Sequence, residues 1–345
     1  MLENNSRTEL ESLGEFGLID LLTKHINIYN TTSTIKGVGD DAAVLDSENK
    51  RTVVSTDLLL EGVHFDLSYF PLKHLGYKAI TANLSDIYAM NAKPTQVTVS
   101  IGLSSRFSLE AVEELYAGML LACDRYQVDL VGGDTSSSKQ GLVISVTAIG
   151  LVNDADVVYR NGAQVNDLLC VTGDLGGAYT GFQLLEREKR IFLANPEIQP
   201  DLEGKDYIVE RQLKPEARRD VIKLLKDLNI KPSSMIDVSD GLASEMMHLC
   251  KNSQVGMCVY EEKIPIDQQT YDMARELDLD PTLTALSGGE DYELLFTISQ
   301  EHFEKLRNQP DITVIGYVTD ASEGINMISK SGNKHTLKAQ GWKAF

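Results

Sequence analysis

The sequence predicts an α/β (α+β) protein of two domains, in which mixed sheets are flanked by helices. Three observations favour this fold class. Runs rich in β-branched residues alternate with helical patterns in two successive blocks. The chain has 345 residues, whereas a compact domain holds about 150. No apolar run reaches the roughly 18 residues that a membrane-spanning helix needs. We therefore expect one domain at 1–152, another at 153–345, and no membrane partner.

The first block alternates three strands with two helices. Residues rich in Val, Ile and Thr predict strands at 52–57, 95–103 and 142–152. Apolar residues at helical spacing predict helices at 72–91 and 108–126. Ser108 is a natural N-cap for the second helix, because a serine oxygen can accept the first unpaired N–H groups.

The second block repeats this alternation. Apolar and β-branched runs predict strands at 168–172, 234–238, 256–260, 292–298 and 312–318. Helices are expected at 177–188, at 242–251 and from Pro215 onward, since proline at the first helical position costs no hydrogen bond. The polar stretch 188–210 is interpreted as an insertion or mobile loop.

Composition excludes some partners and suggests a compartment. With 32 Lys+Arg against 51 Asp+Glu, the formal charge is −19, which disfavours general nucleic-acid binding. A phosphorylated substrate stays possible, because bound metal ions can invert the local field. The four cysteines show no C-x-x-C spacing and have apolar neighbours, as expected of inert thiols in a reducing compartment. The N-terminus is polar and acidic rather than a signal peptide, so we expect a cytoplasmic protein.

Acidic residues stand where an apolar segment ends or beside glycine, which is unusual for solvating charge. They are Asp40, Asp41, Asp57, Asp86, Asp134, Asp237, Asp240, Glu290 and Asp291. Clustered like charges cost several kcal/mol unless they are paired or bind metal. Carboxylates with Ser and Thr hydroxyls, and without a Cys/His cluster, favour Mg²⁺ over Zn²⁺. For any single aspartate, a turn or helix-cap role stays open.

Glycines occur at the ends of several strands, where backbone N–H groups can face an anion. They are Gly132, Gly133, Gly173, Gly176, Gly177, Gly288 and Gly289. Each alone is also compatible with an ordinary turn. The chain has neither a Walker motif nor a G-x-G-x-x-G that opens a βαβ unit, so nucleotide binding would use another scaffold. With no G-x-S-x-G elbow and no activated cysteine, we predict no protein nucleophile.

Nine sequence blocks together resemble the thiamine-monophosphate kinase family of the PurM-like (aminoimidazole ribonucleotide synthetase-like) superfamily. They are GEFGLI at 14–19, GVGDDAAV at 37–44, STDLLLEGVHF at 55–65, KAITANLSDIYAMNAKP at 78–94, LVGGDTS at 130–136, YRNGA at 159–163, VTGDLGGAYTG at 171–181, IDVSDGLASE at 236–245 and SGGEDYELLF at 287–296. The resemblance covers nearly the whole chain; segments 188–210 and 320–337 match least well.

The resemblance implies that ATP phosphorylates thiamine monophosphate to thiamine diphosphate with several Mg²⁺ ions. It assigns metal and ATP binding and dimerisation to the domain at 1–152, and phosphate and substrate binding to the domain at 153–345. The implied metal ligands are Asp41, Ser55, Thr56, Asp57, Asp86, Asp134, Asp237 and Asp240. The implied ATP contacts are Tyr116, Gly133, Asp134, Arg160 and Ser239. The implied thiamine-phosphate contacts are His64, Glu290 and Trp342.

Simpler roles stay open for five of these residues. His64 could be a strand-end histidine, Glu290 and Trp342 could cap a segment and cover a core edge, Tyr116 could pack in the core, and Arg160 could pair with Asp154 or Asp156. The resemblance further implies a homodimer of paired N-terminal sheets. The chemistry is expected to be direct in-line transfer, because a phosphate monoester is largely dianionic at neutral pH and needs no general base.

Two classes of rival function fit the sequence less well: another enzyme of the superfamily and a non-catalytic binding protein. A selenophosphate synthetase or a hydrogenase-maturation dehydratase would need a reactive cysteine near one terminus, but the first cysteine is Cys123 and the chain ends in GWKAF. An aminoimidazole ribonucleotide synthetase would match the STD and SGGED blocks less well. A non-catalytic binding protein would tolerate loss of acidic ligands, yet every matched acid is present. ADP release that requires both Mg²⁺ and thiamine monophosphate would separate the kinase from these rivals.

Overall fold

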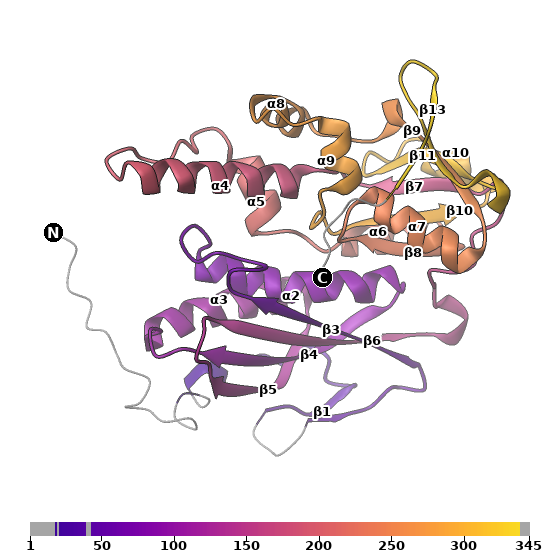
Figure 1. Cartoon of the computed structure of the whole chain (residues 1–345). Coiled ribbons are helices and arrows are strands. Elements are labelled where there is room, and N and C mark those ends of the chain that lie inside the picture. Colours follow the sequence, from indigo (N-terminus) through magenta and orange to yellow (C-terminus); the bar gives the residue numbers. More distant parts are fainter. Residues whose placement is uncertain (1–17, 19–20, 39–42, 339–345) are drawn as a thin grey trace. The chain divides into compact units, whose positions relative to one another are not determined.

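The computed structural model describes residues 18, 21–38 and 43–338, and it divides the chain into two compact units (Figure 1). The first unit runs to Ile87 and takes in Ala92–Asp154. The second comprises Tyr88–Asn91 and the chain from Ala155 onward. Each unit contains a mixed sheet with helices packed against it, which confirms the predicted fold class.

The first unit is built on a four-stranded sheet with two long helices on one face (Figure 1). The strand order is β3-β6-β4-β5; only β4 and β5 pair in parallel. The strands are β3 (Arg51–Leu60), β4 (Lys93–Leu103), β5 (Asp129–Ser137) and β6 (Val143–Val152), with a separate pair β1 (Thr34–Lys36) and β2 (Val44–Leu45). The helices are α2 (Leu72–Ala89) and α3 (Leu109–Tyr126). Burial alternates along β6, as expected when one face of a sheet packs on helices.

Two glycines allow α2 and α3 to touch backbone to backbone. A Cβ atom on Gly118 would lie 1.8 Å from the carbonyl oxygen of Lys73, and one on Gly76 would lie 2.0 Å from that of Leu115. Real Cβ atoms do not approach that closely, so no larger residue fits at either position without displacing a helix. The predicted N-cap of α3 is confirmed: the side chain of Ser108 accepts a hydrogen bond from the backbone N–H of Ala111.

The second unit is built on a seven-stranded sheet of order β13-β12-β9-β11-β7-β10-β8. Neighbouring strands are antiparallel except β12 and β9. The strands are β7 (Leu168–Thr172), β8 (Ser234–Val238), β9 (Gly256–Tyr260), β10 (Glu293–Ile298), β11 (Ile312–Thr319), β12 (Ile325–Ile328) and β13 (Lys334–Thr336). The helices are α4 (Gly177–Ala194), α5 (Asp206–Leu213), α6 (Arg219–Asp227), α7 (Leu242–Ser253), α8 (Gln268–Glu276), α9 (Pro281–Ser287) and α10 (Phe303–Leu306). Short 3-10 turns lie at Asp154–Asp156, Glu261–Lys263, Gln300–His302 and Ala321–Glu323.

Both faces of the seven-stranded sheet are covered, because alternate residues of each strand enter different cores. On β7, Leu169 and Val171 join the core that contains α7 and α9, whereas Cys170 joins the core that contains α6 and α10. A third cluster links α4, α5 and α8 through Leu184, Ile208 and Met273. Strands buried on both faces explain why β7, β8 and β10 are nearly continuous apolar runs in the sequence.

The structure differs from the sequence-based expectation in several details, and three of them bear on the site. Strand β5 was not predicted, because its second half is made of glycine and polar residues and is stabilised by pairing with β4. The interpretation of 188–210 as a loop is wrong at both ends, since α4 continues to Ala194 and α5 begins at Asp206. Burial of Ile208 against α4 and α8 stabilises α5, and a sequence pattern does not reveal that packing. The helix expected from Pro215 begins at Arg219.

All four cysteines are free thiols inside the protein. Burial raises the pKa of the Cys123 and Cys250 thiols to about 12, and it also raises the pKa of the Cys170 thiol. These thiols are therefore protonated and unreactive at neutral pH, as the sequence indicates. Within the described part of the chain, the helices lack the combination of length and apolar character that crossing a bilayer requires.

We expect Gly118→Ala to destabilise the protein by about 1–3 kcal/mol, because the added methyl group collides with the Lys73 carbonyl. Helix propensity alone would make the same change stabilising by roughly 1 kcal/mol, so the sign of the effect identifies the cause. Thermal melts measure it, with Ala117→Ser at an exposed position of the same helix as the control. An unchanged or higher melting temperature for Gly118→Ala would contradict the close crossing.

Candidate active site

Two carboxylates meet between β3 and α2 in the first unit. Ser55 and Asp57 alternate with Thr56 along β3 and so point to the same face of the sheet, toward α2. The Ser55 hydroxyl donates to Oδ2 of Asp86 on α2 at 2.5 Å. The backbone N–H of Asp57 donates to the side-chain oxygen of Asn83, one helical turn earlier, at 3.1 Å. Side-chain oxygens of Ser55, Asp57 and Asp86 therefore come together, although the first two residues are far from the third in the sequence.

The electrostatics of this group suit a cation. Burial, and then the neighbouring charge of Asp86, raises the pKa of Asp57 from 3.8 to about 6. Two carboxylates with a hydroxyl are a donor set of hard oxygens, which Mg²⁺ prefers. Among residues 18, 21–38 and 43–338, no group of three or more His, Cys, Asp or Glu side chains is arranged to hold a metal ion. Asp41, the remaining acid predicted for this unit's metal sites apart from Asp134, lies outside the described residues, as do Asp40 and Trp342.

Thr56 and Asp134 lie on the opposite face of the same sheet. The Thr56 hydroxyl donates to the Val146 carbonyl and accepts from Thr147. Asp134 is exposed on β5 and pairs in register with Ser100, so it shares the face of Thr56 rather than that of Asp57. Gly133 has a packing reason for being glycine: a Cβ there would lie 1.9 Å from the Val99 carbonyl oxygen.

His64 and Tyr116 occupy different environments. His64 follows β3, and its Nδ1 accepts the backbone N–H of Leu60 at 3.0 Å, so a neutral imidazole carries its proton on Nε2. Tyr116 is buried on α3, where burial raises the pKa of its phenol to about 12. The packing role left open for Tyr116 therefore matches its position.

In the second unit, two distant loops join through their backbones. The N–H of Glu290 donates to the Ser239 carbonyl at 2.7 Å, and the N–H of Tyr292 donates to the Val238 carbonyl at 2.9 Å. Asp237 is buried at the end of β8, and Asp240 follows it half-buried in the turn before α7. The IDVSDG and SGGED blocks thus lie together and bring their acidic residues, two of them buried, into one region of this unit.

Glu245 supports this turn, and the sequence-based reasoning did not assign it a role. Its carboxylate is buried in the first turn of α7 and accepts the backbone N–H of Asp240 at 2.9 Å. Burial raises its pKa to about 7, which the hydrogen bond from Asp240 opposes. The signal was available, since a Glu shortly after a helix start is typical of a side chain that caps the preceding backbone.

The charge of Arg160 lowers the pKa of Glu245 and the pKa of His248, which indicates that its guanidinium group lies near both side chains. Burial is the larger cause of the low pKa of His248. The alternative pairing with Asp154 is not what the structure has, because Oδ1 of Asp154 accepts Nε of Arg51 at 2.6 Å. Arg160 is thus on the same side of the second unit as the Ser239 turn, which Glu245 joins.

The SGGED turn has an unusual backbone. The φ angles of Gly289, Glu290 and Tyr292 are +100°, +61° and +51°, and a left-handed conformation is unfavourable for the two non-glycine residues. Asp291 holds the turn: its carboxylate accepts the N–H of Gly176 at 2.7 Å and the N–H of Ala178 at 3.1 Å. Asp291 therefore caps the N-terminus of α4. Of the two interpretations left open for Gly176 and Gly177, an anion site or an ordinary turn, the structure favours the turn, because the Asp291 carboxylate already accepts the N–H of Gly176.

Two arginines neutralise the acids beneath the turn. Arg211 and Arg218 each donate to one oxygen of buried Glu293 at 3.0 Å. Arg211 also lies 3.5 Å from Asp291, and its charge opposes the burial that raises the pKa of Asp291 to about 6. Next to Arg211, Gln212 donates from Nε2 to Oε2 of Glu290 at 3.0 Å. Sequence reasoning missed Arg211 and Gln212 because they directly follow the segment interpreted as a loop, and it missed Arg218 because a helical pattern does not reveal which distant acid an arginine contacts.

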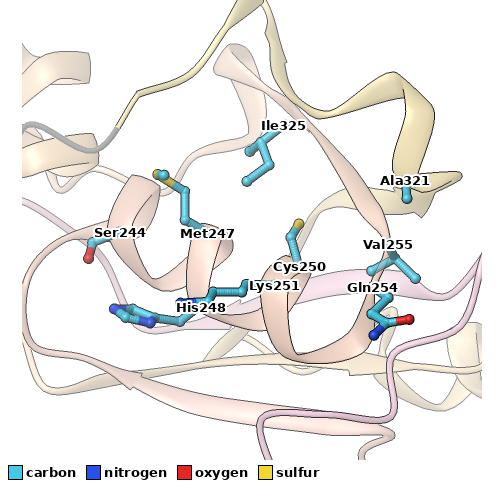
Figure 2. A pocket seen from close by; sticks show the side chains of 9 residues that line it. All are labelled: Ser244, Met247, His248, Cys250, Lys251, Gln254, Val255, Ala321 and Ile325. Carbon is cyan, nitrogen blue, oxygen red and sulfur yellow. The ribbon is translucent and has the colours of Figure 1, made fainter.

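A separate pocket of about 530 Å³ opens beside α7 (Figure 2). Its lining contains none of the predicted site residues. It is lined by Ser244, Met247, His248, Cys250, Lys251, Gln254, Val255, Ala321 and Ile325. With a protonated, buried cysteine and mostly apolar walls, it offers no chemistry to the acidic groups described above.

Comparison with known proteins first defines the class. The family described as "AIR synthase related protein, N-terminal domain" matches residues 39–152. The solved structure of hydrogenase maturation protein HypE in complex with ATP is 20% identical and aligns with a TM-score of 0.73 over 94% of this chain and 95% of its own, a likeness of fold alone. The fold is thus that of the AIR-synthase-related, PurM-like class.

The relatives then give the family. Thiamine-monophosphate kinase of Aquifex aeolicus (strain VF5) is 35% identical over 336 residues, which cover 97% of this chain and 99% of the relative. That of Bacillus subtilis (strain 168) is 33% identical and covers 96% of this chain and 100% of the relative. The structure of AaThiL complexed with AMPPCP and TMP is 34% identical, with a TM-score of 0.74 over 98% of this chain and 99% of that chain. The chain belongs to the thiamine-monophosphate kinase family.

The raised pKa of Asp57 makes a prediction about stability in metal-free solution. The folded protein holds a proton on Asp57 up to about pH 6, whereas the unfolded chain releases it near 3.8, so stability is lost as the pH rises through that window. Asp57→Asn removes this loss. In EDTA at about pH 8 we expect the variant to melt several degrees above the native protein, with the difference narrowing between pH 6 and 4.

The control for this experiment is Asp227→Asn, an exposed position on α6, which should leave the melting temperature unchanged. If Asp57→Asn melts below the native protein both at about pH 8 and at about pH 4, the carboxylate stabilises the fold. Its burial beside Asp86 would then not be the dominant effect.

Proposed function

We propose that this protein transfers the terminal phosphoryl group of ATP to thiamine monophosphate, giving thiamine diphosphate and ADP. The observation that carries the proposal is the match over 98% of the chain to AaThiL, complexed with AMPPCP, an ATP analogue, and with TMP. The acidic groups of both units agree with this chemistry, because a reaction between two phosphates needs its negative charge compensated.

The first unit offers the better-defined metal site. Ser55, Asp57 and Asp86 would hold Mg²⁺ through their oxygens, with Asp41 as a further ligand that the family resemblance implies. Thr56 and Asp134, which the resemblance also implies as metal ligands, lie on the other face of the sheet and would bind a different ion. Bound Mg²⁺ would neutralise phosphate charge and stabilise the transition state of phosphoryl transfer. The protein's own contribution is to keep Asp57 and Asp86 together, which the hydrogen bonds from Ser55 and to Asn83 do.

The second unit would bind substrate through the two joined loops. Asp237 and Asp240 would supply metal ligands, Ser239 and Arg160 would contact ATP, and Glu290 would contact thiamine monophosphate together with His64 and Trp342. The hydrogen bond from the Glu290 N–H to the Ser239 carbonyl supports these roles. It keeps Ser239, the proposed ATP contact, at a fixed distance from Glu290, the proposed thiamine-monophosphate contact. We propose that the chemistry needs no protein base, because the acceptor phosphate is already largely dianionic at neutral pH.

We also propose a homodimer formed through the first unit's sheet, in a cytoplasmic setting that the four free cysteines favour. One face of the sheet packs on α2 and α3, whereas β3 carries exposed apolar residues on the other face. Val54 is 60% exposed and Leu58 is 50% exposed, next to small polar residues such as Thr56 and Thr147. Exposed apolar side chains gathered on one sheet face are typical of a surface that a second copy covers.

The activity is tested by coupled ADP release. We expect release only when ATP, Mg²⁺ and thiamine monophosphate are all present. Asp134→Asn should lower turnover at least about 100-fold while the melting temperature is kept, because Asp134 is exposed. Asp227→Asn serves as the control. ADP release without thiamine monophosphate, or full activity of Asp134→Asn at saturating Mg²⁺, would refute the assignment that it addresses.

The dimer is tested by light scattering. Two chains of 38.1 kDa give 2 × 38.1 = 76.2 kDa, the mass we expect for the native protein. Leu58→Glu places a charge in the proposed interface and should shift the mass to about 38 kDa. Leu121→Glu, at an exposed leucine of α3 outside the sheet face, should leave the mass unchanged. A native mass near 38 kDa would refute the dimer.

A further inference from the structure

We propose that Gln212 is a positioning residue for the acceptor substrate: it fixes the carboxylate of Glu290 in the orientation that binds thiamine monophosphate. This proposal rests on the proposed function and adds a residue to it. Gln212 is only 3% exposed, and its Nε2 donates to Oε2 of Glu290 at 3.0 Å. A buried amide beside a half-buried carboxylate restricts rotation of that carboxylate.

Helix α5 is held firmly enough to serve this role. Ile208 packs between Leu184 of α4 and Met273 of α8. A Cβ atom on Gly181 of α4 would lie 2.3 Å from the Ile208 carbonyl oxygen and 3.1 Å from Cβ of Gln212, so glycine allows α5 to approach α4 closely. The Gly181 backbone therefore sets the distance at which Gln212 reaches Glu290.

The residue before Gln212 anchors the same helix to the same turn. Arg211 donates to Glu293 at 3.0 Å and to the backbone carbonyl of Asp174 at 2.9 Å, and it lies 3.5 Å from Asp291. Adjacent residues of α5 thus hold Glu290, Asp291 and Glu293. Arg211 contacts Asp291 and Glu293, the acids that stabilise the fold, whereas Gln212 donates to Glu290, the predicted substrate contact.

The backbone of the turn explains why Glu290 needs this support. Glu290 has a φ angle of +61°, and a conformation of this kind persists only when the surroundings determine it. The Asp291 cap on α4 and the hydrogen bond from the Glu290 N–H to Ser239 fix the backbone. Those contacts act on the backbone of Glu290, whereas the hydrogen bond from Gln212 acts on its side-chain carboxylate.

A restrained carboxylate favours one part of the acceptor. Thiamine monophosphate carries a positive thiazolium ring, which a fixed carboxylate can face, and a pyrimidine amino group, which can donate a hydrogen bond to that carboxylate. ATP offers no comparable cation. Gln212 should therefore affect recognition of the acceptor and not of ATP.

The test uses Gln212→Met, which keeps the length of the side chain and removes the donor. We expect the KM for thiamine monophosphate to rise about tenfold, while the KM for ATP, kcat and the melting temperature stay close to those of the native protein. Calorimetric binding of thiamine monophosphate should weaken by the same factor. Glu210→Gln, an exposed change on the same helix, is the matched control and should alter none of these values.

A double-mutant cycle separates positioning from packing. In a Glu290→Gln background, Gln212→Met should change the KM for thiamine monophosphate less than about twofold, because the carboxylate it restrains is gone. An equal rise in both backgrounds, or a parallel rise in the KM for ATP, would overturn the proposal. If Gln212→Met does not fold, Gln212→Asn withdraws the same amide from Glu290 and is judged by the same criteria.

The outcomes also separate this proposal from the function on which it rests. If the native protein releases no ADP with thiamine monophosphate, the proposed function fails. If the native protein is active and Gln212→Met keeps its KM for thiamine monophosphate, only the role of Gln212 fails.

Discussion

The cost of holding carboxylates out of water determines how both units are built. In the second unit the protein's own groups offset part of that cost: Asp291 accepts N–H groups at the start of α4, and Glu293 binds two arginines, although burial still raises the pKa of Asp291 to about 6. In the first unit, Asp57 is desolvated beside another carboxylate, and its pKa rises to about 6. The fold thus contains one acidic group compensated by the chain and another whose compensation by a cation is the basis of the proposed chemistry.

Glycine provides the geometry that brings these groups together. Gly76 and Gly118 let α2 meet α3, Gly133 lets β5 meet β4, and Gly181 lets α5 meet α4. At each of these positions a methyl group would collide with a backbone atom of the neighbouring element. These four glycines therefore act by allowing close packing, and the acidic residues on the elements they join depend on that packing for their positions.

Much of the fold could be predicted from the sequence. Strands such as 168–172 and 234–238 are buried on both faces and therefore stand out as nearly continuous apolar runs. Strand β5 escaped prediction because pairing stabilises its glycines and hydroxyl residues. The acids of the site were visible as charges at strand ends, and Asp57 and Asp86 do meet. The pattern could not give the tertiary contacts: which face of the sheet Asp134 takes, and that Gln212 and Asp291 reach residues far along the chain.

The cap on α4 has a consequence during synthesis of the chain. Asp291 is 115 residues beyond Gly176, so the ribosome releases all of α4 long before the carboxylate that completes its first turn. Until the SGGED turn has emerged, the N-terminal end of α4 lacks this acceptor, and a nascent chain is open to fraying there. The acidic region around the SGGED turn and the N-terminal cap of α4 therefore form together, late in the maturation of the polypeptide.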